Sequence, residues 1–406
     1  MKTRLPLTFI LITLMIDAMG IGLILPVMPS LIEEVQGGTL ADAALWGGVL
    51  TTAFAVMQFA FAPTLGNLSD RFGRRPVLLV SLGVMALDYL VMALAGTVWL
   101  LLAGRIVGGV TAATQAVGYA FVADISKPEE KAARFGLIGA AFGVGFVLGP
   151  LIGGLLGEFG TRAPFFAAAA LTTLNLVFGY FVLPETVTDA IRRPFEWRRA
   201  NPFGALMAVT ALPGTGPLVL MFFLYQVAFT VYPAIWAYFT EARFGWEPAM
   251  IGASLAAFGI AMALVQGVLI RHIMRLFGDR GTVRFGLIFN SFAFLAMATV
   301  TNGTLAMILT PLTALGAVVT PAVQGLLSRT VPDNAQGELQ GVLSSAGSLA
   351  MIVSPLLMTG VFFAFTTPGA PVSFPGAPFL VSMLLMGVCW MVFNAPRAQA
   401  VPDRPQ

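Results

Sequence analysis

Charge and cysteine are both scarce in this chain of 406 residues. Charged side chains make up 10% of the residues and hydrophobic ones 58%, whereas about 25% of the residues of a soluble domain are charged. So few charges cannot cover a surface that faces water, which excludes an ordinary soluble protein. The single cysteine, Cys389, excludes a disulfide framework and a cysteine-based metal site, and we expect no bound metal.

Motifs for nucleotide binding and catalysis are absent as well. The three lysines, Lys2, Lys127 and Lys131, follow no Gly-x-x-x-x-Gly-Lys-Ser/Thr loop, so ATP is not the expected energy source. No cluster of a nucleophile with a base or metal ligands is evident. The net charge of +3 does not imply nucleic acid. We therefore expect a protein that is not an enzyme and has no cofactor and no nucleic-acid partner.

Long apolar runs dominate the sequence instead. A helix needs about 20 apolar residues to cross the bilayer core, and breaks of Gly, Pro and charge separate twelve such runs. A membrane β-barrel would show alternating segments of about ten residues, which are not seen. The predicted fold class is an all-α integral membrane protein with the lipid bilayer as its solvent. Its spans are expected near residues 6–31, 44–65, 76–96, 98–124, 134–157, 164–184, 213–241, 248–275, 281–300, 303–328, 338–364 and 375–395.

A polar stretch from Pro184 to about Ala211 divides these spans into two sets of six. We expect an N-terminal bundle at 1–184, a cytoplasmic linker at 185–212, and a C-terminal bundle with a short tail at 213–406. A constant offset of 205 residues relates Gly73 to Gly278, Gly136 to Gly341, and Pro150 to Pro355. Two pseudo-symmetric six-helix bundles with a solute site between them are the expected organisation, because one large class of transporters is duplicated in this way.

The distribution of arginine and lysine predicts the orientation of the spans. With both termini in the cytoplasm, 19 of the 22 Lys and Arg residues lie in cytoplasmic loops, in the linker or in the tails, as the positive-inside rule requires. The exceptions are Arg105, Arg162 and Arg243. We expect a multi-pass protein whose two ends both face the cytoplasm.

Three charged residues lie well inside predicted spans, away from the span ends. Asp17 is about ten residues into the first span and Asp88 about twelve into the third, so both lie near mid-bilayer. A charge facing lipid costs about 2.5–3.5 kcal/mol, so each must face a cavity or a partner. Loss of water favours the neutral form of a carboxyl group, which makes both aspartates candidate proton carriers. Each could instead hold a static hydrogen bond, and Arg105 could snorkel to the outer interface rather than line the cavity.

The second half has no acid inside a predicted span. Its acids lie at or beyond the span ends: Glu241, Glu247, Asp279, Asp333 and Glu338. Neutral groups are therefore expected to contact the solute, with ordinary packing as the alternative for each of them. The candidates for substrate binding are Gln58, Gln226, Tyr232, Trp236, Met262, Gln266, Asn290 and Gln324.

Two motifs stand out from the apolar background. The loop after the second span reads Gly66-Asn-Leu-Ser-Asp70-Arg71-Phe-Gly73-Arg74-Arg75-Pro76. Charge-assisted bonds between its acid and its arginines, with Asp124 as a further partner, can form in one conformation and break in another, which predicts a conformational gate. In the fifth span, Gly145, Gly149 and Gly153 are spaced for close helix packing, and Pro150 and Gly154 accompany them. The alternatives are a solvated basic loop and a purely structural span.

The first motif resembles the signature loop of the major facilitator superfamily, and the second resembles the glycine-proline motif of its drug:proton antiporters. Residues 17–29, 88–89, 104–105 and 239–246 look like those of tetracycline-efflux-type transporters. The resemblance implies the twelve-helix major facilitator fold in a bacterial inner membrane. It also implies a monomer that exports an amphipathic small molecule against protons, as in drug efflux and antibiotic resistance, with Asp17, Asp88 and Arg105 in proton coupling.

The chain departs from tetracycline-efflux proteins at two positions. Those proteins are expected to carry a histidine in the eighth span and an aspartate in the ninth, where this chain has Met262 and Asn290; its only histidine is His272. This difference predicts a solute other than tetracycline. A proton-coupled uptake symporter of the same fold is the alternative function, and a membrane sensor or scaffold is a second one, for which no appended soluble domain is evident.

Overall fold

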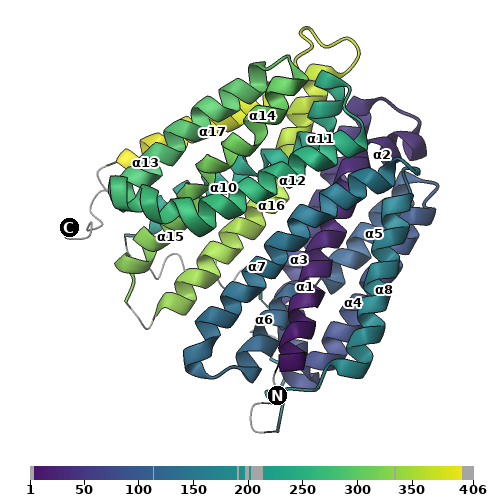
Figure 1. Ribbon diagram of the computed structural model, residues 1–406, viewed down its shortest axis with the longest axis vertical. Coiled ribbons are helices and arrows are strands. Elements are labelled where there is room, and N and C mark those ends of the chain that lie inside the picture. Colours follow the sequence, from purple (N-terminus) through teal and green to yellow (C-terminus); the bar gives the residue numbers. More distant parts are fainter. Residues whose placement is uncertain are drawn as a thin grey trace. The chain divides into compact units, whose positions relative to one another are not determined.

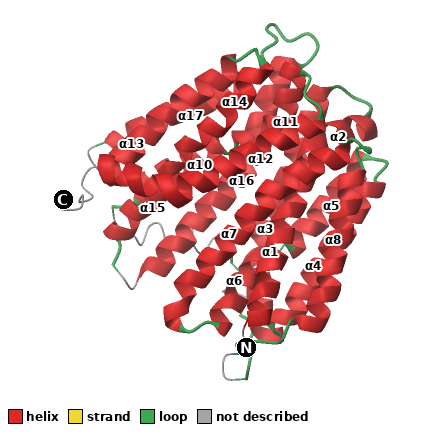
Figure 2. Cartoon of the chain, viewed as in Figure 1, coloured by secondary structure: helices red, strands yellow, loops and turns green. Residues whose placement is uncertain are grey.

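The computed structural model describes residues 4–112, 114–189, 192–196, 201–202, 214–332 and 335–395. All regular elements within these residues are helices (Figure 2). In the first part of the chain they are α1 (Arg4–Ile24), η1 (Leu25–Val27), α2 (Met28–Gln36), α3 (Leu40–Phe72), α4 (Arg74–Leu94), α5 (Val98–Thr111), α6 (Thr114–Ile125), α7 (Pro128–Gly157) and α8 (Ala163–Val182).

The second part of the chain is described as helices too (Figure 1). Its elements are α10 (Gly216–Phe229), α11 (Val231–Phe244), α12 (Pro248–Leu264), η4 (Val265–Leu269), α13 (Ile270–Thr299), α14 (Gly303–Thr313), η5 (Ala314–Val318), α15 (Val319–Thr330), α16 (Gln336–Thr366) and α17 (Ala377–Asn394). The predicted all-α membrane fold is confirmed, because the described residues of the twelve predicted apolar runs are mostly helical.

Eleven helical stretches in the described residues are long and apolar enough to cross a membrane. One of them, Pro248–Thr299, has 52 residues, more than twice what a single crossing needs. It is interrupted at Gly278, whose backbone is not helical (φ 64°, ψ 176°). Counting the stretch as two crossings gives the twelve predicted from the hydropathy.

The described residues form two compact units. Unit 1 comprises the described residues within 1–38, 53–202 and 247–256, and unit 2 comprises those within 39–52, 203–246 and 257–406. The first residues of α3 therefore pack with unit 2, and the first residues of α12 pack with unit 1. The division of the chain at residues 184 and 213 stays a prediction, since much of the linker, with Arg198 and Arg199, lies outside the described residues.

The loop predicted from Gly66 to Pro76 is almost entirely helical, which corrects the sequence analysis. Helix α3 continues to Phe72 and α4 begins at Arg74, so that Gly73 alone separates them (φ 111°). Hydropathy marks where apolar side chains end, but the backbone hydrogen bonds of a helix continue into polar residues. The sharp turn falls on glycine because a side chain is strained at this φ.

Candidate functional site

A buried ion pair lies between α4 and α5 in unit 1. Asp88 is 5% exposed, and its Oδ2 is 3.7 Å from Nη1 of Arg105. The Arg105 guanidinium lies over the ring of Phe54, 4.1 Å from the ring centre. The other carboxylate oxygen, Asp88 Oδ1, is covered and has no hydrogen-bond partner among the described residues. The arginine is therefore the counter-ion of the ionised acid, and one carboxylate oxygen is left without a partner among the described residues.

Two glycines on α5 make room for this carboxylate. A Cβ at residue 104 would lie 2.6 Å from Asp88 Oδ1, and a Cβ at residue 108 would lie 2.6 Å from Asp88 Oδ2. Both distances are well below van der Waals contact, so any side chain there would displace the acid. The resemblance to known transporters pointed to Gly104 but not to Gly108. Glycines one helical turn apart, with Arg105 between them, were the available signal.

Asp17 lies on α1, the other helix of unit 1 that carries an intramembrane acid. Its side chain is partly exposed, but its Oδ1 is covered and has no hydrogen-bond partner in the described residues. Three residues further along the same face, Gly20 contacts the hydroxyl of Tyr89, the residue that follows Asp88. Tyr89 thus connects the face of α1 that holds one aspartate to the segment of α4 that holds the other.

The glycines of α7 pack directly against the backbone of α1. A Cβ at Gly149 would lie 2.6 Å from the Met19 carbonyl oxygen, and Gly145 and Gly153 meet the carbonyls of Met15 and Leu23 in the same way. The close approach predicted from the i, i+4, i+8 spacing is therefore present. Pro150 lies inside α7, and Gly154 contacts the Pro248 carbonyl at the start of α12, which belongs to unit 1. A role of this motif in antiport stays a prediction.

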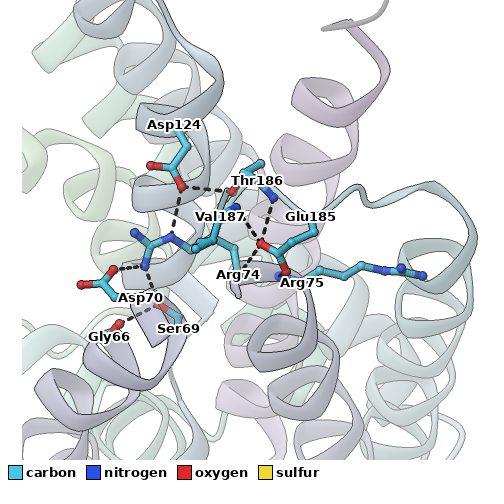
Figure 3. Close-up of polar contacts among 9 residues, drawn as sticks. All are labelled: Gly66, Ser69, Asp70, Arg74, Arg75, Asp124, Glu185, Thr186 and Val187. Carbon is cyan, nitrogen blue, oxygen red and sulfur yellow. Dashed lines mark hydrogen bonds and ion pairs between the residues drawn. The ribbon is translucent and has the colours of Figure 1, made fainter. Parts of the chain in front are cut away.

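Arg74 is the centre of a charged cluster where α3 meets α4 (Figure 3). Its Nη1 is 2.6 Å from Asp70 Oδ1, and its Nε is 3.2 Å from Asp124 Oδ2 at the end of α6. Nη1 also donates to Ser69 Oγ, which in turn donates to the carbonyl of Gly66. The structure therefore brings together Asp70, Arg74 and Asp124, which the sequence analysis had assigned to a gate.

The other arginines of the motif have different contacts. Arg71 lies over the ring of Phe72 at 5.0 Å, and its carbonyl accepts from Arg192. Arg75 donates through Nη2 to the carbonyl of Tyr180 near the end of α8, at 2.7 Å. Neither has an ion pair to Asp70 or Asp124 among the described contacts, so Arg74 is the arginine that joins the two acids.

Unit 2 carries an ion pair at the equivalent place, with its polarity reversed. Asp279 follows Gly278 and pairs with Arg329, whereas Arg74 follows Gly73 and pairs with Asp124. Each member is separated from its counterpart by the same 205 residues that relate the two halves. Gly73 and Gly278 both have positive φ. This pair is not found by matching identical residues between the two halves, because the residues at equivalent positions have opposite charge.

Asn290 lies in a polar cluster at the break between α14 and α15. Its Nδ2 donates to the carbonyl of Gly316 in η5 at 3.0 Å and to the carbonyl of Gly286 at 2.9 Å. Tyr225 donates to the same Gly316 carbonyl at 3.0 Å. Next to Tyr225, Gln226 accepts from Thr320 at 3.4 Å. Two side chains thus satisfy a carbonyl in η5, the short 3₁₀ segment between the two helices.

The remaining substrate-binding candidates are scattered. Tyr232 and Trp236 are buried in an aromatic cluster of unit 2, and Tyr232 contacts five rings at centroid distances of 5.3–6.0 Å: Phe229, Trp236, Phe258, Phe294 and Phe379. Met262 and Gln324 are half-buried, and Gln266 is exposed in the π-helical turn η4. Gln58 belongs to unit 1. Their contact with a solute stays a prediction. The described residues contain no group of three or more potential metal ligands.

Arg162 and Arg243, the two remaining exceptions to the positive-inside pattern, each donate to carbonyl groups at the end of a helix. Arg162 donates to the carbonyls of Ala93 and Ala95 at the end of α4 and pairs with Glu34 at 3.1 Å. Arg243 donates to the carbonyl of Val300 at the end of α13, at 3.1 Å. Both arginines satisfy carbonyls that the end of a helix leaves without partners, which accounts for their positions outside the basic loops.

Comparisons with known proteins cover nearly the whole chain. A family model described as the Major Facilitator Superfamily matches residues 10–355 and, again, residues 217–406. The chain is 41% identical over 389 residues to the tetracycline resistance protein, class C, of Escherichia coli, covering 96% of each protein. It is 39% identical over 388 residues to the class G protein of Vibrio anguillarum, covering 95% of this chain and 96% of that protein.

Solved structures share the fold at lower sequence identity. A bacterial homologue of the human lysosomal transporter Spinster, in an inward-facing and unoccupied conformation, has a TM-score of 0.82 and 13% identity, and the match covers 98% of both chains. Identity at this level indicates a common arrangement of helices only.

Proposed function

The chain belongs to the major facilitator superfamily, and from that premise we propose that it exports an amphipathic small molecule in exchange for protons by alternating access. Membership in this superfamily makes the chain a transporter and not an enzyme. The tetracycline resistance proteins that it resembles over nearly their whole length favour a drug exporter over an uptake symporter, a sensor or a scaffold.

The buried pair of Asp88 and Arg105 is the observation that carries the proposal. In the ionised form, Asp88 has Arg105 as its counter-ion at 3.7 Å. Protonation removes the negative charge of Asp88, so that Arg105 loses its electrostatic partner. The loss of this attraction favours a different arrangement of α4 and α5. Asp17, with a covered and unpartnered oxygen, supplies a second carboxyl group that can take up a proton in the same unit.

The cluster around Arg74 supports a gate. Arg74 joins an acid on its own side of the turn, Asp70, to Asp124 on another helix. Ion pairs of this kind have two discrete states, formed and broken, and can bias the opening of one end of a transporter. Proton binding within the membrane would then be coupled to the making and breaking of these pairs.

The solute is proposed to be amphipathic, with neutral polar groups facing unit 2. The names of the relatives make tetracycline the first compound to test, but Met262 and Asn290 stand where a histidine and an aspartate are expected. No acid lies within the apolar core of a described span of unit 2. A buried charge on the solute would lack a partner there, and a buried charge without a partner is costly.

Location and orientation are part of the same proposal. The relatives are bacterial proteins, and the basic residues gather in the loops and tails assigned to the cytoplasm. We place the chain in the inner membrane of a bacterium, with both termini in the cytoplasm. A monomer, as the family resemblance implies, is part of the same proposal.

Transport into everted membrane vesicles tests the proposal. With the interior acidified, wild type should accumulate the zwitterionic dye rhodamine B, and collapse of the pH gradient should stop this accumulation. Asp17→Asn should abolish it, because an amide of the same shape cannot carry a proton, while its thermal unfolding in detergent should stay within a few degrees of wild type. Glu158→Gln, at an exposed position after α7, is the control and should transport normally.

Two results would contradict the proposal. Dye that leaves acidified vesicles together with protons would indicate a symporter. Full gradient-driven accumulation by a folded Asp17→Asn protein would remove Asp17 from the proton path.

A further inference from the structure

Helix α4 begins with two cations and has no acid in its first turn. The free N–H groups at the start of a helix and the helix macrodipole favour an acid there. In α4, however, the first two residues are the cations Arg74 and Arg75. The side chain of Gly73 cannot cap the helix, because glycine has none. An acid from elsewhere is therefore needed to stabilise the start of this helix.

Glu185, which follows the end of α8, supplies that acid (Figure 3). Its Oε1 accepts from the backbone N–H of Arg74 at 2.9 Å, and its Oε2 accepts from that of Arg75 at 3.2 Å. Oε1 also accepts from the N–H groups of Thr186 and Val187, at 2.8 and 2.9 Å. One carboxylate thus joins the start of α4 to the first residues of the linker.

Gly73 is required for this approach. A Cβ at residue 73 would overlap Oε2 of Glu185, so a side chain at this position would push the carboxylate off the helix. Gly73 therefore has two functions: it permits the positive φ of the turn, and it leaves space for the acid that caps the next helix.

The same segment also holds the partner of Arg74. Thr186 Oγ1 donates to Asp124 Oδ2 at 3.0 Å, the oxygen that Arg74 Nε reaches at 3.2 Å. Further along the linker, the N–H of Arg193 donates to the Asp70 carbonyl at 3.3 Å, and Asn67 donates to the Glu196 carbonyl at 2.7 Å. The start of the linker is thus bound to both sides of the gate.

Unit 2 has no counterpart of this arrangement in its described residues. There the residue after the turn is itself an acid, Asp279, which suits the start of a helix without help. The position 205 residues after Glu185 is Trp390, inside α17. An acid carried by the linker is therefore specific to the half whose gate places an arginine after the turn.

We propose that Glu185 is a positioning residue of the gate: it anchors the start of α4 to the linker and so holds Arg74 between Asp70 and Asp124. This rests on the proposed function, in which the gate opens and closes during transport. Glu185 contacts no solute in this scheme and acts through Arg74.

Hydrogen exchange and transport test the proposal together on the full chain. In Glu185→Gln, one accepting oxygen becomes an NH₂ group that faces a donor, so the Arg74 and Arg75 amides should exchange about tenfold faster. Exchange at residues 276–283, the equivalent turn of unit 2, should stay unchanged. The maximal rate of rhodamine B accumulation in acidified everted vesicles should fall about tenfold at unchanged KM, because the gate and not the solute site is affected.

Two further variants sharpen the result. Asp189→Asn removes an acid from the same linker at a fully exposed side chain that pairs only with Arg192 in the described contacts, and it should behave as wild type in both measurements. Thr186→Val keeps the cap and removes the bond to Asp124, so it should slow transport with wild-type exchange at Arg74. If Glu185→Gln fails to fold, Glu185→Asp takes its place: it keeps the charge but shortens the side chain away from the Arg74 and Arg75 amides, so it should speed their exchange and slow transport in the same way.

Wild-type exchange at Arg74 and Arg75 in Glu185→Gln would overturn the capping contact. Faster exchange with wild-type transport would overturn the positioning role. Exchange is measured on purified protein without solute, so it can be read even if wild type moves no dye. The failure of this proposal and the failure of the proposed function are thereby distinguished.

Discussion

Asp88 fits between α4 and α5 only because residues 104 and 108 are glycines. Gly108→Ala would place a methyl group 2.6 Å from Asp88 Oδ2 and force the carboxylate away from Arg105. We expect the free energy of unfolding to fall by about 1–3 kcal/mol, as in other overpacked sites. Gradient-driven transport should fall about tenfold. Thermal unfolding in detergent and dye accumulation in vesicles measure the two effects.

Gly83→Ala is the matched control for this residue. It lies on α4 itself, five residues before Asp88, and a Cβ there would meet Leu176 at an ordinary 3.7 Å. Its stability and transport should match wild type. If Gly108→Ala transports at the wild-type rate, the position of the Asp88 carboxylate does not matter for coupling.

At the scale of elements, the two turns after α3 and within α13 carry the same ion pair with opposite polarity. Asp279→Arg alone would place two arginines together at a half-buried site. We expect the free energy of unfolding to fall by about 1–2 kcal/mol. Combining it with Arg329→Asp should recover part of this loss, because the first turn already accepts an arginine at this position. Recovery should be incomplete, since unit 2 has no equivalent of Glu185 to cap a helix that begins with a cation.

A double-mutant cycle on thermal unfolding measures this coupling. The exposed pair of Asp189 and Arg192 serves as the control, and its reversal should change stability little. Additive effects of Asp279→Arg and Arg329→Asp would show that the two residues do not stabilise each other.

For the whole molecule, the uncharged residues Met262 and Asn290 predict which solutes the chain transports. Cells that express the chain should gain little resistance to tetracycline, and Met262→His combined with Asn290→Asp should raise it. Asn290→Asp alone should lower stability by about 1–3 kcal/mol, because an ionised acid cannot donate to the Gly316 carbonyl as Nδ2 does. Minimum inhibitory concentrations and thermal unfolding check the two parts.

Ser291→Ala, on the next residue of α13, is a suitable control, since its hydroxyl bonds only its own helix at Leu287 in the described contacts. Strong, proton-dependent tetracycline efflux by the unmodified chain would contradict this prediction. It would mean that the solute site uses polar contacts other than those at 262 and 290.

Most of the architecture could be predicted from the sequence because membrane insertion depends on local composition. Each apolar run had to be helical, since a backbone in lipid must satisfy its own hydrogen bonds, and Asp17, Asp88 and Arg105 stood out because charge within such runs is rare. The spacing of Gly145, Gly149 and Gly153 predicted a close helix contact, and the structure provides α1 as the partner.

The errors and omissions have a common origin. The turn after α3 was predicted too long, because hydropathy reports where apolar side chains end and not where the helix ends. Glu185 and Gly108 were missed because their importance depends on residues distant in the chain: Glu185 lies 111 positions from the Arg74 amide that it caps.

The sequence by itself determined the class of protein, the helical spans, the family and the intramembrane charges, because these follow from the transfer free energy of individual residues and from short motifs. Only the tertiary structure decided the partners. Arg74 pairs with both Asp70 and Asp124, and the Asp88 carboxylate fits against Gly104 and Gly108. These distances depend on how helices that are far apart in the sequence pack together. Electrostatic and steric energies change within a few ångströms, and such distances are not encoded in any local stretch of the chain.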